Sequence, residues 1–88
     1  MSWVYRFDER ALKELKKLGH QAQREILSYL DKRVAGKGDP RRFGKGLRAD
    51  LAGLWRYRVG DYRVLCQIKD REVLVLVVAV GHRKDVYD

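Results

Sequence analysis

Arginine side chains dominate the part of the sequence that could do chemistry. Arg56 and Arg58 alternate within one segment, Arg63 follows in the next, and Arg83 stands near the end of the chain. A guanidinium stays charged at physiological pH, and its planar fork matches two oxygens of one phosphate. These residues could hold a phosphodiester and stabilise the added charge of a pentavalent transition state. We expect Arg63 and Arg83 to occupy solvent-facing positions.

Two side chains near the end of the sequence could move a proton. The first is His82, because histidine as a residue type is the natural general acid or base near neutrality. Tyr87 has an unperturbed pKa of about 10, so neighbouring arginines would have to lower it. A lone histidine is more often a surface residue, and a tyrosine near a terminus can simply cover a sheet edge. The residues themselves leave open which of the two acts.

Metal and thiol chemistry have little support in the sequence. Cys66 is the single cysteine, and neither it nor the acidic residues show the spacing of a metal site. We therefore expect no metal and no other cofactor. If the substrate is RNA, its own 2′-OH can be the nucleophile.

Alternating apolar and polar residues predict the strands that carry the arginines. Residues 55–59 and 62–68 alternate on either side of Gly60-Asp61, which suits a two-residue type II′ hairpin turn. This register places Arg58 directly opposite Arg63. Like charges in that position are destabilising, so the pair makes most sense if an anion lies between them.

The last apolar segment should bring the end of the chain to the same place. Residues 73–80 are apolar at every position, which is typical of an interior strand with both faces covered. A turn at 70–71 would return this strand antiparallel to the one before it. Arg58, Arg63 and residues 82–87 then converge on one rim of the sheet.

The N-terminal half should supply the layer that covers this sheet. Residues 3–7 suit a short strand, Asp8 caps a first helix that ends before Gly19, and a second helix ends at Gly36. Two consecutive amphipathic helices need a sheet to cover their apolar stripes. The sequence predicts a single α+β domain over residues 1–88, in which one small twisted sheet packs on an αα-hairpin.

The charge of the chain indicates the kind of partner. A net charge of +8 attracts nucleic acid, acidic proteins or anionic membrane. Residues 36–48 form a glycine-containing loop with five positive side chains, and its Lys45 and Arg48 are candidate phosphate ligands together with Lys84. For any one of these residues, a solvated position without function is an equally good interpretation. No apolar run approaches the roughly 20 residues of a membrane span, and without an export signal we expect a cytoplasmic protein.

Three motifs carry a resemblance to a known family over nearly the whole chain. They are Phe7 to Glu14, Gly60 to Arg63, and Val80 to Arg83 followed by Val86-Tyr87. With the order strand, two helices and three-stranded meander, they resemble the RelE branch of the RelE/ParE superfamily of toxin–antitoxin toxins. The resemblance implies an endoribonuclease that cuts mRNA in the A site of the 70S ribosome by 2′-OH attack. It also implies a small RelB-like antitoxin that neutralises the toxin and carries the complex to operator DNA.

The same resemblance suggests individual roles. Arg63 and Arg83 match family arginines that stabilise the transition state and assist the leaving group, and Tyr87 matches the proposed general base. Arg56 and Arg58 stand where RelE has two lysines. Because arginine cannot serve as a base, proton abstraction would fall to Tyr87 or His82.

Two other hypotheses about the function are consistent with the sequence. A ParE-like toxin shares the fold but poisons DNA gyrase without being a nuclease. A non-catalytic module could use the same basic rim to bind RNA or the ribosome. The joint presence of Arg63, Arg83 and Tyr87 favours the nuclease.

Overall fold

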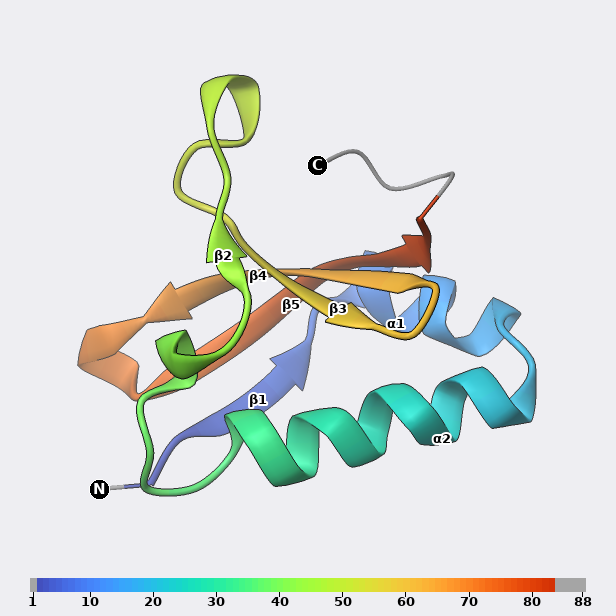
Figure 1. Cartoon of the computed structure of the whole chain (residues 1–88), viewed down its shortest axis with the longest axis horizontal. Coiled ribbons are helices and arrows are strands. Elements are labelled where there is room, and N and C mark those ends of the chain that lie inside the picture. The colour runs from blue at the N-terminus through green and yellow to red at the C-terminus, as the bar shows by residue number, and fades with distance from the viewer. Residues whose placement is uncertain (1, 84–88) are drawn as a thin grey trace.

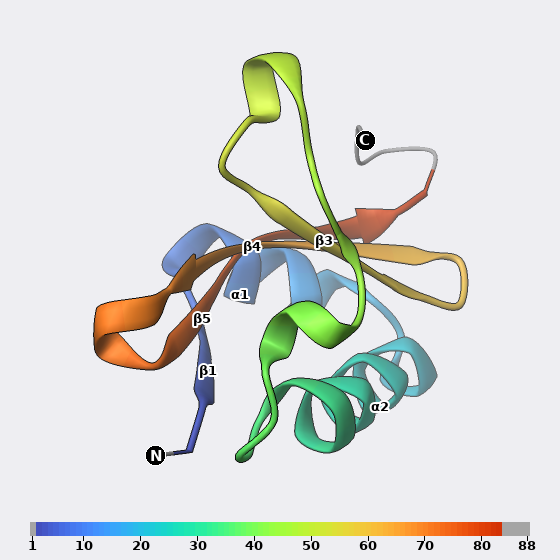
Figure 2. The same ribbon diagram turned by 60° about the vertical axis from the view of Figure 1, so that its left-hand side comes forward.

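The computed structural model describes residues 2–83 and shows a five-stranded sheet with both helices on one face (Figures 1 and 2). The predicted α+β architecture is confirmed. The strands lie in the order β1-β5-β4-β3-β2. The elements are β1 (Val4–Phe7), α1 (Glu9–Lys17), α2 (His20–Tyr29), β2 (Lys45–Gly46), β3 (Trp55–Val59), β4 (Tyr62–Lys69) and β5 (Leu74–His82).

The first strand passes directly into the first helix. The Asp8 carboxylate accepts a hydrogen bond from Ala11 N at 2.8 Å and so caps α1. β1 pairs in parallel with β5, from Val4 opposite Leu74 to Phe7 opposite Val77. The helix therefore starts where this pairing stops, and it runs beside the remaining part of β5.

The second helix ends differently from the prediction. A regular helix was expected up to Gly36, but Leu30–Val34 form a π-turn in which Ala35 N donates to Leu30 O at 2.9 Å. Leu30 and Val34 are both fully buried. Gly36 follows with φ at +111°, a conformation that favours glycine. No helix within residues 2–83 is long and apolar enough to cross a membrane.

The predicted hairpin between β3 and β4 is confirmed in its register. Val59 lies opposite Tyr62, and Arg58 lies opposite Arg63. Gly60 has φ at +59°, as the first central position of a type II′ turn requires. The short turn leaves one possible pairing, so every side chain of the hairpin is assigned to a face.

The strand predicted at 73–80 is interior, as expected, but it starts later and runs longer. A 3-10 turn at Asp70–Glu72 precedes it, and β5 continues to His82. A β-bulge shifts its register: Cys66 lies opposite Val77, whereas Leu65 lies opposite Ala79. The helix-facing residues are buried, but the alternate positions are only half-buried. The expectation that both faces are covered is therefore met on the helix side alone.

The segment predicted as a loop over 36–48 contains structure of its own. Pro40–Arg42 form a 3-10 turn, and Lys45–Gly46 form β2, which pairs antiparallel with β3. Short-range patterns could not predict β2, because a strand of two residues is too short to show alternation. The segment that contains β2 is held by side chains of β3 and of the turn before β5.

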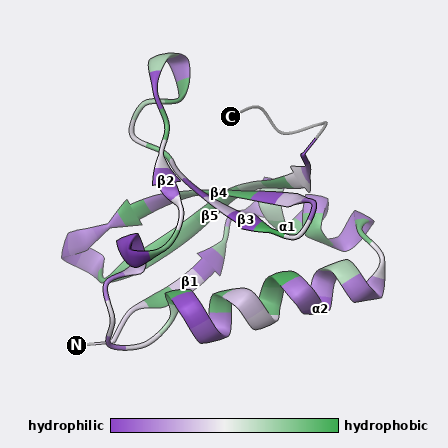
Figure 3. Cartoon of the chain, viewed as in Figure 1, coloured by the Kyte–Doolittle hydropathy of each residue, from purple (hydrophilic) through white to green (hydrophobic). Residues whose placement is uncertain are grey.

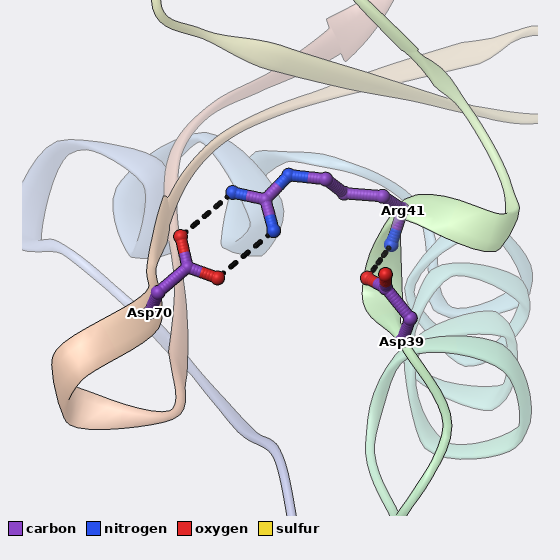
Figure 4. A network of polar contacts seen from close by, with 3 residues as sticks. All are labelled: Asp39, Arg41 and Asp70. Atoms are coloured by element: carbon purple, nitrogen blue, oxygen red, sulfur yellow. Dashed lines mark hydrogen bonds and ion pairs between the residues drawn. The ribbon is translucent and has the colours of Figure 1, made fainter.

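Three polar contacts fasten this segment to the sheet. The Tyr57 hydroxyl donates to Pro40 O at 2.6 Å in a buried position, and Trp55 Nε1 donates to Phe43 O at 2.8 Å. Arg41 forms a bidentate pair with Asp70, at 2.9 and 2.8 Å (Figure 4). The segment therefore follows β3 closely and delivers β2 to the sheet edge.

Both edges of the sheet are short or blocked. At the start of β1, Trp3 N donates to Gly36 O at 2.6 Å and Gly36 N donates to Trp3 O at 3.0 Å. This bridge ties the segment after α2 to the outer side of β1. At the opposite edge, β2 offers only two residues.

The core lies between the helices and the sheet. Figure 3 shows apolar residues along β5 and in stripes on α2, as an amphipathic helix over a sheet requires. Cys66 is fully buried within this layer, and burial raises the pKa of its thiol. The main buried residues are Ala11, Leu15, Ile26, Leu30, Val34, Tyr57, Val64, Cys66, Val75, Val77 and Val80.

We expect Tyr57→Phe to lower the free energy of unfolding by about 1–3 kcal/mol, since it leaves the buried Pro40 carbonyl without its donor. Tyr5→Phe is a matched control, because the Tyr5 hydroxyl donates to Asp31 at the same distance of 2.6 Å but in an exposed position. Water can replace the lost donor at this exposed carboxylate, so the loss should be smaller than that of the buried Tyr57 hydroxyl. Urea denaturation of the two variants measures the difference; equal losses would contradict the anchoring role of Tyr57.

Candidate functional site

The arginines lie on the face of the sheet that the helices leave open. Tyr57 and Val59 of β3 are buried on the helix side, so Arg56 and Arg58 point the other way. On β4 the same alternation puts Arg63 on the open side, since its neighbour Val64 belongs to the core. We call this open side the arginine face.

Cross-strand pairing arranges the arginine face in two rows. One row holds Lys45, Arg56, Leu65 and Ala79, because these residues are successive Cα partners across β2, β3, β4 and β5. The next row holds Arg58, Arg63 and Gly81. Side chains directly opposite each other lie about 4.5–5.5 Å apart at Cβ. Cations from three strands are thus brought side by side, and the sequence-predicted ligand Lys45 joins them through β2.

The central arginines are buried, which corrects the expectation that Arg63 faces solvent. Arg56 and Arg63 are each 8% exposed, whereas Arg58 and Arg83 are exposed. Arg56 and Arg63 are both flanked by strands on either side, and this explains their burial. Burial lowers the pKa of Arg63, and the charges of Arg58 and Arg83 lower it further. Burial and the charges of Arg63 and Arg58 likewise lower the pKa of Arg56.

These pKa changes describe the electrostatics of the arginine face. A lowered arginine pKa means that the surroundings disfavour the charged form, by lost hydration and by repulsion. An anion placed between the guanidinium groups would reverse both effects. Sulfate, carboxylate and phosphodiester groups all have that chemistry, and the phosphate oxygens match the planar fork.

Arg83 joins the cluster from the end of β5. Its backbone N donates to Asp61 O at 2.8 Å, which ties it to the turn between β3 and β4. The charge of Asp61 also raises the pKa of Arg63 and partly offsets the repulsion there. From the sequence Asp61 was assigned only to the hairpin turn, although its place directly before Tyr62 and Arg63 was a usable signal for this charge.

His82 reaches the same rim but belongs to the other face. It lies opposite Tyr62, with ring centroids 5.7 Å apart in an edge-to-face arrangement. The cross-strand pair Val64 and Val80 is buried on the helix side. Tyr62 and His82 are each two residues away from that pair, so they share its side of the sheet. The bulge in β5 is responsible. Without it, the phase of Val75 and Val77 would have placed His82 on the arginine face and Arg83 on the helix side.

The remaining candidates are more distant or lie outside the described residues. Arg48 is exposed on the arm between β2 and β3, which is closed by a hydrogen bond from Leu47 N to Leu54 O at 3.0 Å and projects away from the helices (Figures 1 and 2). Lys84 and Tyr87 fall outside residues 2–83. Within that range no cluster of histidine, cysteine and carboxylate side chains could hold a metal ion.

Comparison with known proteins identifies relatives over almost the full chain. The family model described as the ParE toxin of the type II toxin–antitoxin system parDE matches residues 5–87. Toxin RelG of Mycobacterium tuberculosis is 33% identical, over 99% of this chain and 98% of its own length. The mRNA interferase toxin RelE of Escherichia coli is 35% identical, over 96% of this chain and 86% of its own.

A solved structure shows the same relationship to RelE-type toxins. The toxin–antitoxin complex RelBE2 of Mycobacterium tuberculosis contains a chain that superposes on this one with a TM-score of 0.85 and 32% identity, covering 97% of this chain and 95% of the other. Its fold therefore agrees with the sheet and helices described above. The chain belongs to the RelE/ParE superfamily and is a RelE-type toxin of a type II toxin–antitoxin system.

Proposed function

We propose that this toxin is a ribosome-dependent endoribonuclease that cleaves mRNA in the ribosomal A site. The observation that carries the proposal is the row in which Arg58 lies directly opposite Arg63, with Arg83 beside them. Such a row is favourable around a phosphodiester that gains charge during reaction. The name of the Escherichia coli relative, an mRNA interferase, supports the same substrate.

In the proposed reaction the 2′-OH of the RNA attacks the adjacent phosphorus and the 5′-oxygen leaves. Arg63 and Arg83 would stabilise the pentavalent transition state and assist the leaving group. Arg56, Arg58 and Lys45 would hold the backbone on either side of the scissile phosphate. Arg48 on the projecting arm and Lys84 near the C-terminus would contact phosphates further away; these outer contacts raise affinity and make it dependent on salt.

We assign proton abstraction from the 2′-OH to Tyr87. The position of His82 on the helix side, with its ring against Tyr62, supports this choice over the histidine. A base must reach the proton that it removes, and the phosphate would lie on the opposite face. A cluster of arginines also favours the phenolate over the phenol.

The proposed protein partner is an acidic RelB-like antitoxin. Solved relatives include toxin–antitoxin complexes, among them RelBE from Escherichia coli. An acidic chain that folds onto a protein of net charge +8 would associate rapidly, and occupation of the arginine face would exclude RNA. Operator DNA would be bound only by the complex.

The match to the ParE family model supports a second candidate, a toxin that poisons DNA gyrase. The two candidates predict different damage in cells. We expect brief expression without antitoxin to stop translation and to create new mRNA 5′ ends within reading frames, as sequencing of those ends would show. Induction of the DNA-damage response over intact mRNA would support gyrase as the target instead.

We expect Arg83→Ala to slow cleavage of mRNA on programmed ribosomes by about 10²–10³-fold, or about 2.7–4 kcal/mol, in line with the loss of one transition-state donor. Arg6→Ala is the control. Arg6 is exposed on β1, which β5 separates from β4, and its removal changes the net charge equally. Similar losses in both variants would show that overall charge, and not the site, sets the rate.

We expect Tyr87→Phe to slow single-turnover cleavage by about 10²–10⁴-fold, because the ring remains and only the hydroxyl is lost. His82→Gln should have a smaller effect. A base acts when deprotonated, so the wild-type rate should rise with pH through the pKa of that base. A rise near pH 6–7 would indicate histidine, and a rise at higher pH a tyrosine whose pKa is lowered. If His82→Gln is inactive while Tyr87→Phe keeps the wild-type rate, the two roles must be exchanged.

A further inference from the structure

The end of β5 is held by different elements on its two sides. On one side β4 pairs with it as far as His82 opposite Tyr62. On the other side the pairing with β1 stops at Phe7 opposite Val77, and Asp8 N donates to Val77 O at 2.9 Å just before the chain turns into α1. Beyond Val77, the outer edge of β5 has no strand partner within residues 2–83.

A carboxylate of α1 takes the place of that missing strand. Glu14 Oε1 accepts a hydrogen bond from Val80 N at 2.9 Å. The bulge of β5 falls between Val77 and Val80. The Val80 N–H therefore points away from β4, in the part of β5 that extends past the end of its pairing with β1. Val80 is 3% exposed, and an unbonded N–H there would lose its hydration without replacement.

Glu14 stands at an unusual place for a charged residue. It directly precedes the buried Leu15 and follows the buried Ala11 by three positions, which puts it on the margin of the buried side of α1. Its side chain is only 29% exposed. Its second oxygen lies 3.6 Å from Arg10 Nε, whose side chain is 80% exposed. Partial burial of the carboxylate is offset by the bond to the strand.

The residues beyond Val80 carry the candidate site. Gly81 is the cross-strand partner of Arg63, and Arg83 N donates to Asp61 O. Val80 directly precedes these residues, and it is fixed both by Glu14 of α1 and by its pairing with Val64 of β4. A shift of Val80 would therefore move the end of the strand that carries Arg83.

We propose that Glu14 is a positioning residue for the arginine face. Glu14 fixes the end of β5 so that Arg83 meets the phosphate beside Arg63. The inference rests on the proposed function for its effect on cleavage. Its structural part, the dependence of the Arg83 position on Glu14, stands independently. A displacement of about 1 Å at a reacting centre can cost roughly 10²-fold in rate.

Three variants separate positioning from simple packing. Glu14→Ala removes the acceptor. Glu14→Gln keeps an oxygen at the same place, so it should restore the bond without the charge. Arg10→Ala removes the ion-pair partner of Glu14 and leaves the bond to Val80 intact, and it serves as the control.

Two measurements are made on each full-length variant. Hydrogen exchange of the Val80 and Arg83 amides reports the position of the strand end without any reaction. Single-turnover cleavage on programmed ribosomes gives the rate at saturation and the half-saturating ribosome concentration. For Glu14→Ala we expect faster exchange at both amides and a rate about 10- to 100-fold lower, with half-saturation changed less than about twofold. Glu14→Gln should recover most of the rate, and Arg10→Ala should match wild type.

The outcomes distinguish this inference from the proposed function. If the wild-type protein does not cleave mRNA, the proposed function fails, and the exchange of the Arg83 amide still decides the role of Glu14. Unchanged protection of Arg83 in Glu14→Ala would overturn the inference whatever the activity. A wild-type cleavage rate in Glu14→Ala would also overturn it, as would a Glu14→Gln variant as slow as the alanine variant.

Discussion

The repulsion between Arg58 and Arg63 is the constraint around which this sheet is organised. Two guanidinium groups face each other across β3 and β4, and the turn at Gly60 allows no other pairing. The apolar residues on the reverse side of the same strands hold this register together with the turn, because a shift by one residue would expose them to water. Burial of Tyr57, Val64 and the β5 valines on the helices compensates for the repulsion. Stability on one face thus maintains a strained arrangement of charge on the other.

The bulge in β5 connects the core to the chemistry. It keeps Val77 and Val80 in the buried layer although they are three residues apart, and it changes the phase of everything that follows. As a result Arg83, and not His82, shares the face of Arg58 and Arg63, two residues beyond their β5 partner Gly81. A feature that resembles an irregularity of packing therefore decides which side chain reaches a ligand on the open side.

Local patterns were sufficient for the register of the β3–β4 hairpin, because a two-residue turn and strict alternation allow one solution. They were also sufficient for the first helix, for the start of the second and for the interior place of β5. They failed where the outcome depends on contacts distant in sequence: β2 exists because Tyr57 and Trp55 bind the carbonyls of Pro40 and Phe43. The burial of Arg63 and the face of His82 depend on neighbouring strands and on the bulge, which an uninterrupted apolar run does not reveal.

The bridge between Trp3 and Gly36 has a consequence for the behaviour of the protein in concentrated solution. An open strand edge is a template on which other chains can pair and begin to aggregate. Here the outer side of β1 is occupied at its start by the segment after α2, and Arg6 adds a charge within the strand. The opposite edge ends in a strand of two residues that includes a lysine. The start of β1 and the edge formed by β2 are thus less open to pairing with other chains, and Lys45 contributes to this protection as well as to the arginine face.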